Sequence, residues 1–176
     1  MRLYLLGYMG SGKSRVGQNL ADFLGFDFMD MDDYIEERYR ISIHDFFDKY
    51  GEGAFRIAES KILKETITRD DIVIATGGGT PCYFDNIDFI NEHGISVYLK
   101  VEPAILAERL HGSRKKRPVI SNVRKEDLDH VIVQQLYERE LYYIKARHVI
   151  DVSFMEGDEI EKAVLAATQV YVVSDR

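Results

Sequence analysis

Short apolar runs alternate along the chain with longer segments in which apolar positions recur at helical spacing. Glycine or polar residues bound the short runs, which is the pattern of strands buried on both faces of a parallel sheet. Five strands are expected, at residues 3–6, 26–30, 72–75, 95–99 and 149–152. The helical pattern covers residues 14–24, 34–39, 43–50, 54–66, 85–92, 103–110, 126–146 and 158–168.

Local signals support several of these boundaries. Gly25 follows the first helical segment, as a glycine that ends a helix does, and Pro103 suits a first helical position. Ser42 and Asp45 have the spacing of an N-terminal cap. Alternating strands and helices predict an α/β fold with three layers, a five-stranded parallel sheet flanked by helices on both faces. Ligands bind such sheets beyond the carboxyl ends of the strands, so polar residues there are the candidates for function.

Composition narrows the class of protein. The 176 residues contain no repeat and no linker, so one domain spanning residues 1–176 is expected. With 30 acidic and 23 basic residues the net charge is −7, which argues against a general nucleic-acid-binding protein. The single cysteine, Cys82, cannot form an internal disulfide and fits a reducing compartment. No apolar run approaches the roughly 18 residues of a membrane span, and the N-terminus lacks a signal-peptide pattern. We therefore expect a cytoplasmic protein without a membrane partner.

The first strand is followed directly by a phosphate-loop motif. Residues 7–14, GYMGSGKS, fit the pattern G-x-x-x-x-G-K-[ST] and run into the first helix. Glycines let backbone N–H groups converge on phosphate oxygens at the helix N-terminus. Lys13 would neutralise the β- and γ-phosphates, and the Ser14 hydroxyl would ligate Mg²⁺. The motif predicts binding of a nucleoside triphosphate; the alternative is a glycine-rich turn with a solvated lysine.

Among the proteins that use this loop, a small-molecule kinase is favoured. A GTPase should carry the guanine-binding sequence N-K-x-D, and no asparagine in this chain is followed by lysine. A motor or an oligomeric ATPase would normally be larger, with further domains for coupling.

Residues that follow the second and third strands predict the acceptor side. Asp30 and Asp32 should face the same way along a strand, where they could hold a hydrated Mg²⁺ and an acceptor hydroxyl. The alternative is that Asp32 or Asp33 merely caps the next helix. The run Gly77–Gly79 indicates close approach of the backbone to a ligand, although a glycine turn is the commoner explanation of such a run taken alone.

Three cationic features are candidates for binding anions. Arg56 begins a helix after a glycine-bracketed turn, and Arg139 lies well inside the long helix before the fifth strand. The planar fork of arginine suits a carboxylate, but most helix arginines are solvated surface residues. The basic run at residues 114–118 could be a nucleic-acid or localisation patch or a solvated charge run. A mobile lid over residues 111–124, which carries an arginine onto the transferring phosphate, fits an acidic chain better.

Taken together, these motifs resemble those of the shikimate kinase family. GYMGSGKS, FMDMD at 28–32, Phe55-Arg56, Thr76–Gly79 and Arg117-Pro118 occur in the family's order and approximate spacing. The phosphate loop alone is widely shared, but the set is specific and spans nearly the whole chain. The resemblance implies a P-loop kinase of the nucleoside monophosphate kinase type with a mobile lid. It also implies transfer of the γ-phosphate of ATP to the 3-hydroxyl of shikimate, giving shikimate 3-phosphate and ADP for chorismate and aromatic amino-acid biosynthesis.

The resemblance also implies roles for individual residues, and a monomer. ATP would contact Gly10, Ser11, Gly12, Lys13, Ser14, Arg15, Arg109 and Arg117. Mg²⁺ would be held by Ser14, with Asp30 assisting through water. Shikimate would contact Asp32, Arg56, Gly77, Gly78, Gly79 and Arg139. Lys13, Asp32 and Arg117 would be catalytic, with Asp32 taking the acceptor hydroxyl as orienter or as base.

Two other functions stay open at this point. A related kinase of another small hydroxy acid, such as gluconate, shares the phosphate loop but is not expected to combine the triple glycine with Arg56. A nucleotide-dependent regulatory module that has lost catalysis is the alternative from another class. Retention of Lys13, Asp30, Asp32 and Arg117 argues against it.

Overall fold

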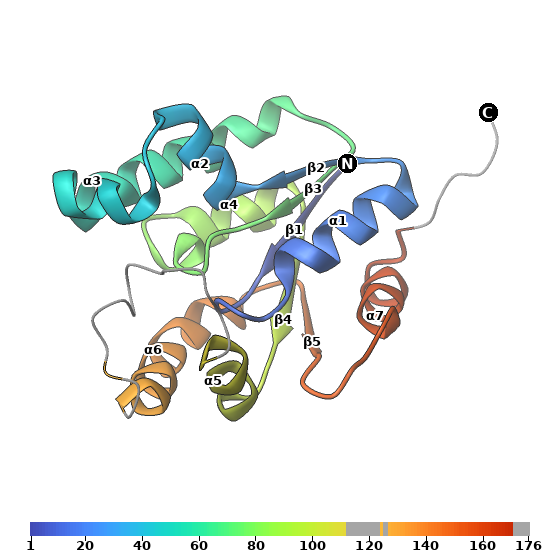
Figure 1. Ribbon diagram of the computed structural model, residues 1–176. Coiled ribbons are helices and arrows are strands. Elements are labelled where there is room, and N and C mark those ends of the chain that lie inside the picture. Colours follow the sequence, from blue (N-terminus) through green and yellow to red (C-terminus); the bar gives the residue numbers. More distant parts are fainter. Residues whose placement is uncertain (112–123, 125–126, 171–176) are drawn as a thin grey trace.

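The computed structural model describes residues 1–111, 124 and 127–170. At its centre is a five-stranded sheet in the order β2-β3-β1-β4-β5, in which every pairing is parallel (Figure 1). The strands are β1 (Arg2–Leu6), β2 (Asp27–Asp30), β3 (Ile72–Ala75), β4 (Ile95–Lys100) and β5 (His148–Asp151). The predicted strands are confirmed, with ends that differ by no more than one residue.

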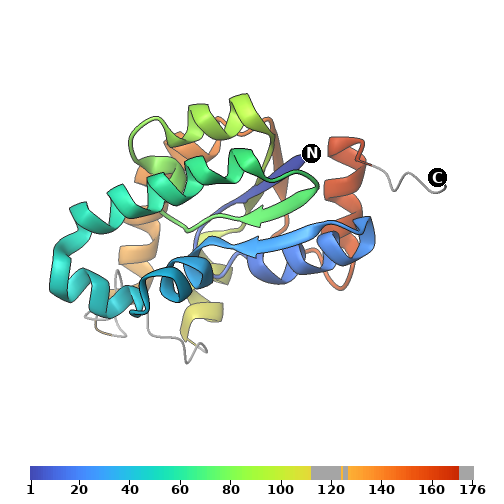
Figure 2. The same ribbon diagram turned by 90° about the horizontal axis from the view of Figure 1, so that it is seen from above.

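Helices cover both faces of this sheet. α1 (Lys13–Leu24) and α7 (Glu159–Thr168) pack against each other on one face, whereas α3 (Ile43–Glu65) and α4 (Asn86–His93) lie on the other (Figure 2). α2 (Met31–Tyr39) packs on α3, and α5 (Pro103–His111) packs on α6 (Leu128–Tyr143). The predicted three-layer α/β architecture is therefore confirmed. None of the described helices combines the length and the apolar character needed to cross a bilayer.

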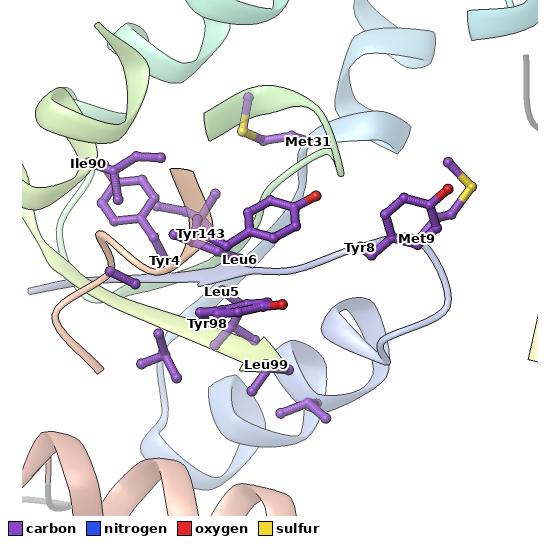
Figure 3. Close-up of a cluster of buried hydrophobic side chains, with 14 of the residues drawn as sticks. Tyr4, Leu5, Leu6, Tyr8, Met9, Met31, Ile90, Tyr98, Leu99 and Tyr143 are labelled. Carbon is purple, nitrogen blue, oxygen red and sulfur yellow. The ribbon is translucent and has the colours of Figure 1, made fainter. Parts of the chain in front are cut away.

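The core is built around β1, the central strand. Leu3, Tyr4, Leu5 and Leu6 are completely buried, because β3 and β4 flank the strand and helices cover both of its faces. Figure 3 shows the apolar cluster gathered along this strand, with aromatic rings from β4 and α6 among its members. The ordered strand gives the phosphate loop a rigid starting point at Leu6.

Two helix ends and one kink show how the sequence sets the boundaries. Gly25 ends α1 in the left-handed conformation, at φ 68°, and the Ser42 hydroxyl accepts a hydrogen bond from the Asp45 N–H. The segments 43–50 and 54–66, predicted as two helices, are confirmed as the two helical stretches of α3, which meet at a kink at Gly51, where φ is 79° and ψ is 164°. Most of the predicted lid, residues 111–124, lies outside the described residues.

Candidate active site

The phosphate loop joins β1 to α1 at the carboxyl edge of the sheet. Gly7, Gly10 and Gly12 have φ of 147°, 84° and 94°, values that L side chains rarely adopt. A side chain at Gly7 would also meet the Leu99 carbonyl at 2.9 Å. Such a backbone turns N–H groups toward a common centre at the N-terminus of α1, which is the arrangement that binds phosphate.

Lys13 begins α1 and is nearly buried beneath this loop. Its ammonium donates to the carbonyls of Gly7 at 2.8 Å and Tyr8 at 3.0 Å. The side chain therefore already lies across the loop, where phosphate oxygens would compete with the two carbonyls for its protons. It lines a cleft of about 290 Å³ whose walls are Met9, Gly10, Gly12, Lys13, Ser14, Arg15, Asp30, Asp32, Thr76 and Gly78.

The predicted metal pair, Ser14 and Asp30, is in direct contact. The Ser14 hydroxyl donates to Asp30 Oδ2 at 2.5 Å, which brings the second residue of α1 and the end of β2 together. A hydroxyl and a carboxylate at one point offer the oxygen ligands that Mg²⁺ prefers.

The local geometry around Asp30 corrects the sequence analysis in two respects. β2 ends at Asp30 and α2 begins at Met31, so the strand alternation used for Asp30 and Asp32 does not extend to Asp32. Nor do Asp32 or Asp33 cap the helix, because the cap is Asp30 itself. Its Oδ1 accepts from the N–H groups of Asp32 at 3.0 Å and Asp33 at 3.4 Å. Asp30 therefore uses one oxygen on the backbone and the other on Ser14.

The glycine run after β3 is the point where the charged residues of the acceptor side converge. An added Cβ at Gly77 would lie 2.5 Å from Glu59 Oε1 and 2.8 Å from Asp32 Oδ1. At Gly78 it would lie 3.6 Å from Arg139 Nη1, and at Gly79 only 2.5 Å from Arg56 Nη1. Each glycine thus adjoins a different ionic side chain, and the absence of side chains lets the backbone pass between them.

Arg56 is the most strongly held of these groups. Its guanidinium is 5% exposed and donates to Glu59 at 2.9 Å and to Glu52 at 2.9 and 3.1 Å. Its carbon atom also lies 4.4 Å from the centre of the Tyr83 ring. Burial opposes the charge, but the two carboxylates outweigh burial and raise the pKa of Arg56. The guanidinium therefore keeps its charge and its geometry before any ligand arrives.

Arg139 reaches the same place from α6. Its guanidinium adjoins Gly78, and its carbon atom lies 5.2 Å from the centre of the Tyr8 ring. The side chain is partly exposed. The two predicted anion-binding arginines, 83 positions apart in the sequence, therefore border one glycine run. The alternative that they are ordinary solvated surface residues does not agree with this placement.

The remaining predicted nucleotide contacts lie around the loop. Arg109 donates to the Gly10 carbonyl at 3.1 Å, which places its guanidinium against the loop. Arg15 lines the cleft, and its guanidinium lies 3.8 Å from Glu161 and 3.5 Å from the carbonyl of Gly157 after β5. Ser11 is buried within the loop, and its N–H donates to Tyr8 O at 3.1 Å. Arg117 lies outside the described residues.

Three polar residues of the site were missed from sequence. Glu52 and Glu59 lie four residues before and three after Arg56, the spacing of ion pairs on one helix face, and this signal could have identified them. Tyr143 lies one helical turn after Arg139, and its hydroxyl donates to the Gly78 carbonyl. Burial raises the pKa of Tyr143, which keeps this donor protonated. No sequence motif marks Tyr143, because its partner belongs to another element.

Replacing Gly79 by alanine is expected to lower kcat/KM for the acceptor by about 100-fold, because the new methyl group displaces Arg56. The methyl carbon would lie 2.5 Å from Nη1 and 2.7 Å from Cζ of a guanidinium held by two carboxylates. The KM for the nucleotide should stay near its native value. Gly53→Ala is the matched control, since a side chain there meets nothing within 4 Å. Steady-state kinetics of the two variants test this, and equal acceptor kinetics in both would contradict it.

Comparisons with known proteins identify the family to which this chain belongs. The family model described as shikimate kinase matches residues 9–169. A shikimate kinase of Phocaeicola vulgatus is 40% identical over 160 residues, which cover 91% of this chain and 89% of that protein. The crystal structure of shikimate kinase from Bacteroides thetaiotaomicron has a TM-score of 0.91 at 33% identity and covers 97% of this chain and 99% of its own. A structure of the Acinetobacter baumannii shikimate kinase in complex with shikimate has a TM-score of 0.87 at 32% identity, covering 96% of this chain and 92% of that one. This chain belongs to the shikimate kinase family.

Proposed function

We propose that this chain transfers the γ-phosphoryl group of ATP to the 3-hydroxyl of shikimate, giving shikimate 3-phosphate and ADP. The observation that carries the proposal is the convergence of Asp32, Arg56 and Arg139 on the glycine run beside the phosphate loop. Two guanidinium groups there suit one carboxylate. A carboxylate beside them suits a hydroxyl. Shikimate carries both a carboxylate and a hydroxyl, and it is the acceptor expected for a member of this family.

Binding of the nucleotide follows from the loop. The N–H groups of residues 10–14 and the Lys13 ammonium would hold the β- and γ-phosphates, while Arg109 borders the loop at Gly10. As the bond from the γ-phosphorus to the leaving group breaks, negative charge builds on the β-phosphate oxygens and stays spread over the oxygens of the transferring group. A cation fixed beside these oxygens before reaction stabilises the transition state without reorganisation.

Positioning of the acceptor follows from the ionic groups around residues 77–79. Arg56 and Arg139 would bind the carboxylate of shikimate and fix the orientation of its ring. The acceptor hydroxyl would donate to Asp32, which lines the same cleft as Lys13. The oxygen then points at the γ-phosphorus, and Asp32 orients it and receives its proton as the new bond forms.

Mg²⁺ is the cofactor that this donor set fits. Ser14 and Asp30 would hold it, Asp30 through water, on the evidence of their direct contact. When bound, the ion neutralises charge on the β- and γ-phosphates.

The substitution Asp30→Asn should distinguish the role of Asp30 in holding Mg²⁺ from its role as the cap of α2. Asparagine caps a helix about as well as aspartate, so the free energy of unfolding should change by less than about 0.5 kcal/mol. The Mg²⁺ concentration for half-maximal activity should rise about 10- to 100-fold. Asp30→Ala serves as the comparison and should also lose about 1 kcal/mol of stability. Metal titrations and urea unfolding measure both quantities, and an unchanged Mg²⁺ requirement in Asp30→Asn would refute the metal role.

We further propose that residues 1–176 act as one kinase domain, as a monomer in the cytoplasm, without a nucleic-acid or membrane partner. Arg117 would complete the phosphate site from a lid at residues 111–124. The basis for Arg117 is its motif, Arg117-Pro118, since the residue lies outside the described part of the chain.

A direct test of the proposed function compares acceptors in a coupled assay of ADP release. With ATP and Mg²⁺, shikimate should stimulate ADP formation, and its kcat/KM should exceed that of gluconate by at least about 100-fold. A preference for gluconate would assign the chain to another hydroxy acid. If shikimate does not stimulate ADP formation above basal ATP hydrolysis and no transfer occurs in a single turnover, the nucleotide-dependent regulatory module is the function that remains.

A further inference from the structure

The second residue of the phosphate loop, Tyr8, is tied to the acceptor side of the site. It is 1% exposed although it lies in a loop, and Figure 3 shows it beside Met9 where the chain leaves β1. Its hydroxyl donates to Gln135 Oε1 on α6 at 2.7 Å. Its ring lies under the guanidinium of Arg139, one helical turn further along, at 5.2 Å from ring centre to Cζ.

Arg56 and Arg139, the two arginines proposed to bind the acceptor substrate, are held in place by different kinds of interaction. Arg56 is fixed by ion pairs with Glu52 and Glu59. Among the described residues no carboxylate lies within ion-pair distance of Arg139, and the Glu52 carboxylate interacts with it only at longer range. The guanidinium of Arg139 adjoins the Tyr8 ring, Tyr143 and Gly78. An aromatic ring attracts the flat face of a guanidinium and leaves the N–H groups in its plane directed outward. The Tyr8 ring therefore fixes the position of the Arg139 guanidinium, whose N–H groups stay directed toward a ligand.

Resting on the proposed function, we propose that Tyr8 is a positioning residue for Arg139, so that the phosphate loop itself builds part of the site for the shikimate carboxylate. The side chain of Tyr8 faces the acceptor arginine, while its backbone carbonyl accepts from Lys13 at 3.0 Å. One loop residue thereby serves both substrates through different atoms. Its side chain can be changed without removing the backbone carbonyl.

The test measures binding of each substrate separately by calorimetry on the full chain. Tyr8→Leu should weaken shikimate binding, measured without nucleotide, by about 5- to 30-fold, because the ring under Arg139 is lost. Tyr8→Phe keeps the ring and should stay within about threefold of the native affinity. Both variants should bind ADP within about threefold of the native chain. Tyr137→Leu removes a ring from the exposed face of α6 and should leave shikimate binding unchanged.

A double substitution shows whether Tyr8 acts through Arg139. In an Arg139→Ala background, Tyr8→Leu should cause no further loss of shikimate affinity. A full further loss there, unchanged affinity in Tyr8→Leu, or a parallel loss of ADP affinity would overturn the proposal. If Tyr8→Leu does not fold, Tyr8→Met fills similar volume without a ring and is expected to give the same result. A native chain that binds no shikimate would instead refute the proposed function, so the two failures are distinguishable.

Discussion

Replacing Lys13 by alanine is expected to lower kcat by about 1,000-fold, with little change in the KM for shikimate. The ammonium would stabilise charge that develops on the phosphoryl oxygens, and loss of one such donor costs about 10²- to 10³-fold in rate. Its position under the loop, bonded to two loop carbonyls, keeps it in place before reaction. Steady-state ADP release measures the effect.

Lys61→Ala is the matched control for this variant, since Lys61 is an exposed lysine on α3. Its kcat should be that of the native chain. Unfolding curves of Lys13→Ala check that the loss is catalytic, because Lys13 makes hydrogen bonds within the folded loop. Retention of more than a tenth of native kcat in a folded Lys13→Ala variant would contradict the role of Lys13.

Replacing Arg56 by alanine should damage both binding and stability. The KM for shikimate should rise by about 100-fold, because a charged hydrogen-bonding partner of the carboxylate is lost. The free energy of unfolding should fall by about 3–5 kcal/mol, because Glu59 is 1% exposed and loses its cation. Urea unfolding and acceptor kinetics measure the two effects.

A double variant separates these effects. Arg56→Met combined with Glu59→Gln removes both charges of the pair, so it should recover much of the lost stability without restoring shikimate affinity. The Glu59 carboxylate also accepts from Thr80 at 2.6 Å, a bond that glutamine can keep. Native shikimate affinity in Arg56→Ala or in the double variant would show that Arg56 does not bind the acceptor.

Features carried by local patterns could be predicted from the sequence. The strand positions follow from short apolar runs, and the phosphate loop follows from glycines that the backbone needs at φ above 80°. The gathering of Asp32, Arg56 and Arg139 was implied only by the family resemblance, because residues far apart in sequence meet through the order of the strands. The strand order cannot be predicted from an apolar run, because the run does not show which strands will lie beside it.

Two tyrosines that border the site could not be identified from the sequence, for the same reason. Tyr8 and Tyr143 act through contacts with other elements, and a tyrosine taken alone in a sequence is most simply interpreted as a core residue. Asp30 and Asp32 were expected to face the same way along one strand, but the Asp30 carboxylate caps α2, and the strand ends at Asp30. Here a short-range interaction decided the geometry, since an aspartate whose carboxylate accepts from the backbone N–H groups two and three residues later favours a helix start over strand continuation.

The most direct test of the central claim is identification of the product by phosphorus and proton NMR after incubation with ATP, Mg²⁺ and shikimate. The account predicts one phosphate monoester at the 3-hydroxyl of shikimate, formed in a one-to-one ratio with ADP. Inorganic phosphate as the only new phosphorus species, or a phosphate on another hydroxyl, would contradict it.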